Sequence, residues 1–172
     1  MTEAHEPGTE SHQLWVIDTS SLLAVRETYS AAHERMVFKA MAKYATRQKL
    51  LYPTEVRAEL ERGSESQSNP DPPLVWVRDH RHCSERPADL ATVGRVLARV
   101  PDLLDPDNPH EQADPYVLAV SLDLQIGGFD VCVVTDDRRD RPTRISLATA
   151  VGMFRLATVP LHAFVRGEKL YP

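Results

Sequence analysis

Leu14-Trp15-Val16-Ile17-Asp18-Thr19-Ser20-Ser21-Leu22-Leu23 runs from four apolar residues into an aspartate and then into three hydroxyl residues. An apolar run of this length, bounded by small polar residues, is typical of a short strand buried on both faces. The carboxyl end of such a strand would place Asp18 at the edge of a sheet, where open α/β sheets hold their ligand sites. Asp18 either caps a helix that begins at Ser20 or Ser21, or it belongs to a site.

A second stretch repeats this pattern. Residues 130–137 (DVCVVTDD) run from an apolar strand into a threonine and two aspartates. Further short strands are expected at 50–52 and 155–159. Helical periodicity, caps and breakers predict helices over these ranges: 20–26, 29–47, 53–63, 74–83, 87–100, 114–126, 145–151 and 161–165. Because strands alternate with helices, we expect parallel βαβ units in an α/β sandwich.

Composition sets limits on the class of protein. A chain of 172 residues with 42% hydrophobic and 26% charged residues fits one globular domain, expected over 13–170, and the polar residues 1–12 are expected to be a disordered arm. The net charge of −5 excludes a basic nucleic-acid-binding surface over the whole molecule. Two cysteines outside any motif suggest reduced thiols and a cytoplasmic protein. No apolar run is long enough to predict a membrane span, and no secretory signal is expected.

Four carboxylates fall at the ends of predicted elements or on an inward face: Asp18, Glu59, Asp114 and Asp137. Asp114 is expected at the N-cap of a buried helix, with Pro115 in its first turn. Carboxylates gathered at one sheet edge repel one another unless a cation neutralises them. Mg²⁺ or Mn²⁺, which prefer oxygen ligands, fit such a cluster and can support hydrolysis of a phosphodiester. A zinc site at His80, His82 and Cys83 is disfavoured, because their spacing matches no common pattern.

The order and spacing of these acids resemble the PIN-domain ribonucleases, especially the VapC-like toxins of toxin–antitoxin systems. Four short motifs carry the resemblance: Val16–Leu23, Val56–Leu60, Ala113–Ala119 and Val133–Asp137. Together they cover about residues 14–165. The chain departs from the pattern in a Pro-rich loop at 101–112 and in an arginine-rich segment after the fourth motif. The segment 141–169 resembles the tail of an uncharacterised PIN-like subfamily.

The resemblance implies a three-layer α/β/α sandwich with a mainly parallel sheet, whose acidic pocket binds Mg²⁺ or Mn²⁺ and cuts RNA. The residues that match the catalytic acids are Asp18, Glu59, Asp114 and Asp137. The expected metal ligands are Asp18, Asp114 and Asp137, with adjacent Asp136 as the alternative fourth acid. Glu55 is the alternative to Glu59 if the helix register differs. Ser20 and Thr135 match the hydroxyl residues that support the acids.

The arginines that follow the fourth motif have two interpretations. Arg138, Arg139 and Arg141 could contact RNA phosphates, or they could form an exposed loop paired to Asp130, Asp136 and Asp140. The resemblance further implies a cognate antitoxin protein as partner and a possible homodimer. Two other hypotheses remain: a catalytically inactive PIN-like binding module, and a phosphatase, which is disfavoured because an Asp-x-Asp motif is missing at Asp18.

Overall fold

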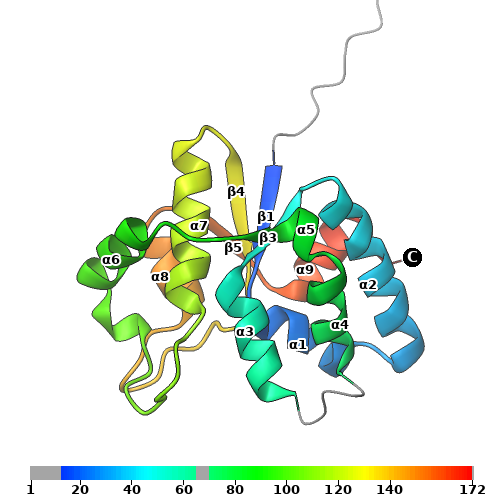
Figure 1. The fold of residues 1–172 in the computed structure, drawn as a ribbon, viewed down its shortest axis with the longest axis horizontal. Coiled ribbons are helices and arrows are strands. Elements are labelled where there is room, and N and C mark those ends of the chain that lie inside the picture. Colours follow the sequence, from blue (N-terminus) through cyan, green and yellow to red (C-terminus); the bar gives the residue numbers. More distant parts are fainter. Residues whose placement is uncertain (1–12, 65–69, 172) are drawn as a thin grey trace, which may run out of the picture.

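The fold is a five-stranded parallel sheet covered by helices on both faces (Figure 1). The computed structural model describes residues 13–64 and 70–171, so the arm predicted at 1–12 lies outside the described residues. The strands are β1 (Gln13–Ile17), β2 (Leu50–Pro53), β3 (Glu85–Arg86), β4 (Asp130–Val134) and β5 (Ala157–Val159). Every pairing in the order β3-β2-β1-β4-β5 is parallel. The α/β class and the parallel sheet predicted from the sequence are therefore confirmed.

The helices form two layers. On one side of the sheet lie α1 (Thr19–Thr28), α2 (Ala31–Thr46), α4 (Pro72–Asp79), α5 (Arg81–Ser84) and α9 (Leu161–Gly167) (Figure 1). On the other lie α6 (Leu90–Arg99), α7 (Asp114–Ile126) and α8 (Leu147–Met153). Helix α3 (Thr54–Gly63) follows β2 directly and packs against α4 and α1, and a short 3₁₀ helix covers Pro101–Leu103. The three-layer α/β/α arrangement is therefore present.

The strand order reverses between β1 and β4. The chain passes from β1 to β2 on one side and later returns to β4 on the other. Ile17 pairs with Val134, so the residues that follow these two strands emerge side by side. In parallel α/β sheets, ligands bind at such a switch point, outside the carboxyl ends of the strands.

The apolar runs of β1 and β4 are buried on both faces, as their composition predicts. Val16, Ile17, Val133 and Val134 have no exposed surface. Burial of an aliphatic side chain of this size contributes about 1.5–3 kcal/mol, so the two strands hold their carboxyl ends firmly in place. Helix α7, predicted to be buried from its apolar sequence, packs against β1, β2 and β4.

Several boundaries differ from the sequence prediction. The helix expected over 74–83 is divided at His80 into α4 and α5. Helix α6 begins at Leu90, because Asp89 caps it by accepting a hydrogen bond from the Ala91 amide. Asp114 is the first helical residue of α7 and Ala113 occupies the N-cap, one position earlier than predicted. Among the described residues, no helix has the length and apolar character needed to cross a membrane.

Candidate active site

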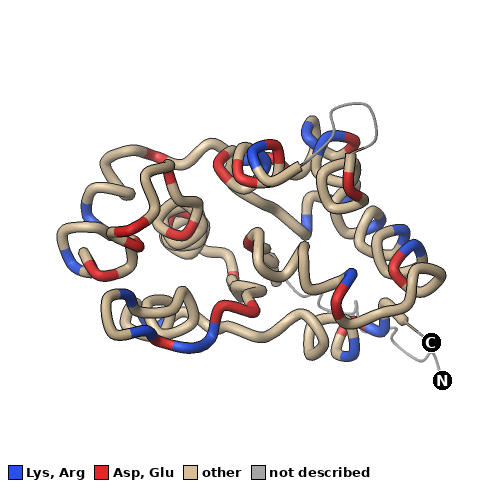
Figure 2. The backbone as a smooth tube through the Cα atoms, turned by 90° about the horizontal axis from the view of Figure 1, so that it is seen from below, with Lys and Arg blue, Asp and Glu red and all other residues tan. Residues whose placement is uncertain are grey.

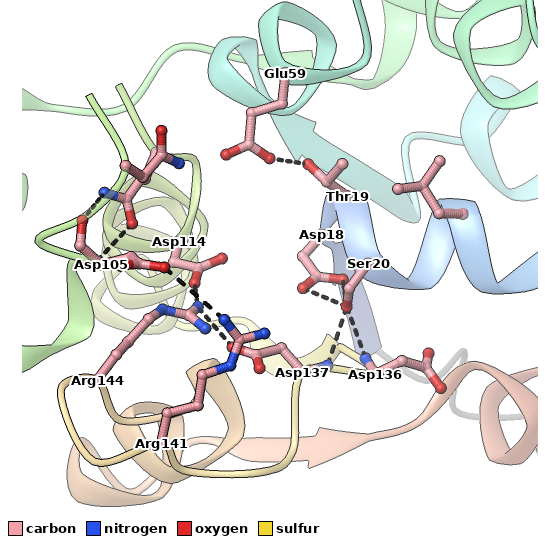
Figure 3. A pocket seen from close by; sticks show the side chains of 13 residues that line it. Asp18, Thr19, Ser20, Glu59, Asp105, Asp114, Asp136, Asp137, Arg141 and Arg144 are labelled. Carbon is pink, nitrogen blue, oxygen red and sulfur yellow. Dashed lines mark hydrogen bonds and ion pairs between the residues drawn. The ribbon is translucent and has the colours of Figure 1, made fainter. Parts of the chain in front are cut away.

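An acidic cavity of about 430 Å³ lies at the carboxyl ends of β1 and β4 (Figure 3). Its lining includes six acids: Asp18, Glu59, Asp105, Asp114, Asp136 and Asp137. Arg141 and Arg144 also line it. In Figure 2, which views the molecule from the carboxyl ends of the strands, acidic positions of separate segments surround the centre of this face and a basic stretch adjoins them. The four acids predicted from the sequence therefore share one cavity.

Asp18 follows β1 and serves two purposes. Its Oδ1 accepts the amide of Ser21 at 2.9 Å, which caps α1, and its Oδ2 accepts the hydroxyls of Thr135 at 2.7 Å and Ser20 at 2.8 Å. The residue is 2% exposed. Burial, followed by the charge of Asp114, raises the pKa of Asp18 to about 7 even though these hydrogen bonds lower it. Asp18 therefore both caps α1 and lines the acidic cavity.

Ser20 connects the two strand ends. Its hydroxyl donates to Asp18 and accepts the amides of Asp136 and Asp137, each at 3.0 Å. Thr135 also accepts the Asp137 amide, at 3.1 Å. The two hydroxyl residues expected to support the acids therefore fix the position of Asp18 relative to the turn after β4.

Glu59 joins α3 to the start of α7. Its Oε2 accepts the Thr19 hydroxyl, and its Oε1 accepts the amide of Ala113 at 2.8 Å. Glu55, one turn earlier on α3, is not among the residues that line the cavity. The structure therefore places Glu59 at the cavity, where it holds the residue that precedes Asp114.

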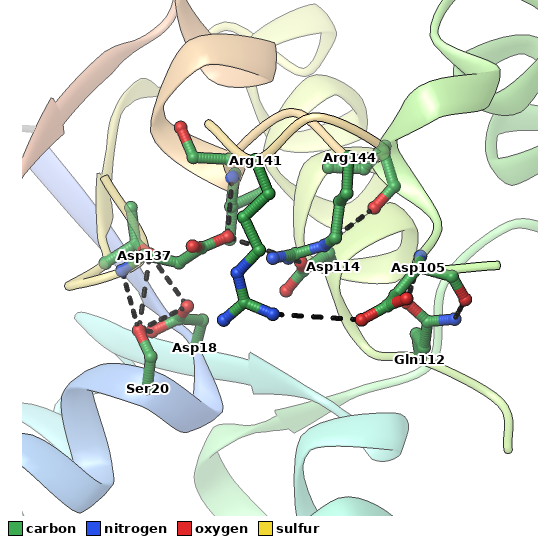
Figure 4. A network of polar contacts seen from close by, with 12 residues as sticks. Asp18, Ser20, Asp105, Gln112, Asp114, Asp137, Arg141 and Arg144 are labelled. Carbon is green, nitrogen blue, oxygen red and sulfur yellow. Dashed lines mark hydrogen bonds and ion pairs between the residues drawn. The ribbon is translucent and has the colours of Figure 1, made fainter. Parts of the chain in front are cut away.

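Asp114 and Asp137 are bridged by one guanidinium (Figure 4). Arg144 Nη2 donates to Asp114 Oδ2 and, at 2.7 Å, to Asp137 Oδ2. Asp137 Oδ2 also accepts the Leu147 amide at 2.9 Å, at the first turn of α8. Burial raises the pKa of Asp114 to about 6, although the charge of Arg144 opposes this rise.

Asp136 and Asp137 differ in where their carboxylates point. Asp136 Oδ2 accepts the Ser21 hydroxyl at 2.6 Å and the Leu161 amide at 3.0 Å, so it ties α1 to the start of α9. Figure 3 shows this carboxylate turned away from Asp114. Asp137 faces Asp114 through Arg144, and its contacts favour it as the fourth acid of the cluster.

The arginine-rich segment is partly ordered by the acids around it. The Arg141 side chain is 64% exposed, and its Nη1 lies 3.9 Å from Oδ2 of Asp105. Asp105 was not among the acids that the sequence suggested as partners for these arginines. Arg138 and Arg139 are exposed. Asp140 accepts the Ser146 amide and the Thr149 hydroxyl, both at 2.8 Å, and these hydrogen bonds lower its pKa. The segment is exposed, as one of the two interpretations expected, but among the described residues its arginines form no ion pair with Asp130, Asp136 or Asp140.

The donor set of the cavity fits a hard divalent cation. All the ionisable donors are carboxylates, the ligands that Mg²⁺ and Mn²⁺ prefer. Burial raises the pKa of Asp18 and Asp114, and the charge of a neighbouring acid adds to each rise, so a bound cation would favour the ionised carboxylates. No three Asp, Glu, His or Cys side chains in the described part of the chain are close enough to ligate one ion together as they stand. Carboxylates would therefore have to move towards an ion that binds here.

Comparison with known proteins gave no match, either to a model of a protein family or to a curated protein.

Three features of the site were missed by sequence reasoning. Thr19 holds Glu59, Arg144 bridges two acids, and the Pro-rich loop contributes Asp105 to the cavity. Gln112 folds that loop by accepting the Asp105 amide at 2.8 Å. Thr19 gave a usable signal, because it stands in the first motif. The other contacts depend on loops whose course no local pattern predicts.

Proposed function

We propose that this protein is a metal-dependent endoribonuclease of the PIN-domain type, which cuts single-stranded or structured RNA. One observation carries the proposal: Asp18, Glu59, Asp114 and Asp137 come from four separate segments and line one cavity at the switch point of a parallel sheet. Capping alone explains one carboxylate at a time. It does not explain why all four share a cavity in which their charges repel one another.

The residues that would hold Mg²⁺ or Mn²⁺ are Asp18, Asp114 and Asp137, with Asp136 as the alternative. A divalent ion bound by such acids supplies Lewis-acid chemistry, which activates water and stabilises the charge that develops on a phosphodiester. Ser20 and Thr135 orient Asp18 through hydrogen bonds to its Oδ2, so they hold one carboxylate of the proposed cation site in place.

Two further groups of side chains have roles in this proposal. Glu59, held by Thr19 and the Ala113 amide, presents a fixed carboxylate that can accept a proton at the cavity. Arg141 lines the cavity and is largely exposed, so its guanidinium can pair with an RNA phosphate. Arg138 and Arg139, exposed on the same segment, extend this basic surface.

We also propose that the nuclease is the toxin of a type II toxin–antitoxin pair, inhibited by a cognate antitoxin protein, and that it forms a homodimer. The support for this part is the resemblance of the four acidic motifs to VapC-like toxins.

RNA cleavage by the purified protein tests the proposal. Mg²⁺ or Mn²⁺ should support cleavage and a chelator should stop it. Asp18→Asn and Asp114→Asn should each abolish cleavage, because each removes a charge that the cation needs. Asp130→Asn is the matched control, since Asp130 lies at the opposite end of β4 and is exposed. Cleavage that persists undiminished in both site variants would refute the assigned site.

One observation favours a second function, that of a catalytically inactive PIN-like binding module. Arg144 already neutralises part of the charge on Asp114 and Asp137 without any metal. If the protein is such a module, calorimetry will detect no binding of divalent ions, and substitution of the acids will change stability alone.

A further inference from the structure

Arg144 is set apart from the other arginines of its segment by its burial. Its side chain is 11% exposed, whereas that of Arg141, three residues earlier, is 64% exposed. Desolvating a guanidinium is unfavourable unless carboxylates compensate for it, and here Asp114 and Asp137 do so. Its position is therefore tied to these two acids.

The backbone around Arg144 holds it in this position. Arg141 and Arg144 form an antiparallel bridge, in which the Arg141 amide donates to the Arg144 carbonyl at 2.7 Å. Arg144 Nε donates to the Leu103 carbonyl at 3.2 Å, and the next amide, that of Ile145, donates to the Asp102 carbonyl at 2.9 Å. The guanidinium is thus anchored by backbone contacts that do not involve the acids.

The acid cluster consequently has two unlike halves. On one side, Asp114 and Asp137 share a cation that belongs to the chain. On the other, Asp18 accepts hydrogen bonds from the uncharged groups of Ser20, Ser21 and Thr135, and no ion pair formed by the described residues includes it. Figure 4 shows Arg144 at the Asp114 side, away from Asp18.

We infer that Arg144 takes the place of a second divalent ion between Asp114 and Asp137, so that the carboxylates assigned to the cation site bind a single ion. This inference rests on the proposed function, because it concerns the cation site of that function. A guanidinium carries one positive charge and two or more donors in a fixed plane, which suits two facing carboxylates. Arg144 therefore positions Asp114 and Asp137 in the absence of any ion.

Titration calorimetry with Mn²⁺ alone, without RNA, tests this inference. Wild-type protein should bind one Mn²⁺. Arg144→Met removes the charge and keeps much of the side-chain volume, and this variant should bind a second Mn²⁺, with the first bound at least about tenfold more tightly because a nearby like charge is gone. Arg141→Met, the same change on the same segment, should keep the wild-type stoichiometry.

Each outcome bears on the inference. One Mn²⁺ with unchanged affinity in Arg144→Met, or two in wild type, would overturn it while leaving the proposed nuclease intact. No Mn²⁺ binding by wild type would overturn the proposed metal site together with the inference.

Thermal unfolding provides a second readout in case Arg144→Met folds poorly. Without metal the variant should unfold at a lower temperature than wild type, and Mn²⁺ should restore most of the difference. Failure of Mn²⁺ to stabilise the variant more than wild type would contradict the inference. Arg144→Lys retains the charge, so it should fold without metal and bind one Mn²⁺.

Discussion

The burial of Asp18 makes the stability of the metal-free protein depend on pH. In the unfolded chain this carboxyl ionises near 3.8, whereas burial and the charge of Asp114 raise its pKa to about 7 in the folded protein. The folded state therefore keeps a proton that the unfolded state loses between these values. It follows that the contribution of Asp18 to the free energy of unfolding is greatest below about pH 4 and falls as the pH rises to about 7.

The size of this effect follows from the two pKa values. One pKa unit corresponds to about 1.36 kcal/mol, so Asp18 accounts for a loss of up to about 4 kcal/mol across this range. Burial raises the pKa of Asp114 to about 6, so Asp114 also lowers the free energy of unfolding as the pH rises, over a range that ends at a lower pH. Both losses concern the protein without divalent ions, because a bound cation favours the ionised carboxylates.

Urea denaturation in the presence of a chelator, at several pH values from 4.5 to 8, measures this effect. Asp18→Asn replaces the carboxyl with a neutral group of the same shape, so its stability should fall less with pH than that of wild type. Asp130→Asn should keep the wild-type slope, because Asp130 is exposed. Equal slopes for wild type and Asp18→Asn would refute the argument that Asp18 is buried as a proton-binding group.

Two other substitutions distinguish residues that support the site from residues that take part in its chemistry. Ser20→Ala removes a hydrogen-bond partner of Asp18 and of two backbone amides, so chemical denaturation should show that the free energy of unfolding falls by about 1–3 kcal/mol. In the control Ser30→Ala, at an exposed helix start without a side-chain cap, the free energy of unfolding should change by no more than about 0.5 kcal/mol. Equal losses in the two variants would contradict the role of Ser20. Glu59→Gln keeps an acceptor for the Ala113 amide, so the melting temperature should change little. It removes a carboxylate that can accept a proton, so the rate of RNA cleavage should fall at least about tenfold. The rate should fall less in the control Glu55→Gln, because Glu55 lies on the same helix but does not line the cavity.

The sequence was sufficient to predict the elements that carry the acids. The apolar runs of β1 and β4 are buried because both faces of the sheet are covered, and the residue after such a strand must lie at the sheet edge. The same reasoning placed Asp18, Thr135 and Asp137 near one another, and the structure brings them together through Ser20.

Features that arise only from tertiary contacts could not be predicted in this way. Strand β3 is two residues long, Glu85–Arg86, and exists because it pairs with Tyr52 and Pro53. Nothing in its own composition favours a strand. Likewise, four arginines follow the fourth motif. Among the described residues only one of the four, Arg144, bridges two acids, and the sequence does not show which one it is. That contact depends on the turn formed by Arg141 and Arg144.

The central claim is that the shared acids form a metal-dependent nuclease site, and the rate of RNA cleavage by Asp114→Asn relative to wild type tests it most directly. The assay compares both proteins after chelation and after Mn²⁺ is restored. The account predicts that Mn²⁺ restores cleavage in wild type, and that Asp114→Asn remains at least about 100-fold slower while still folded. Cleavage by Asp114→Asn at the wild-type rate, or cleavage by wild type that continues in the chelator, would contradict it.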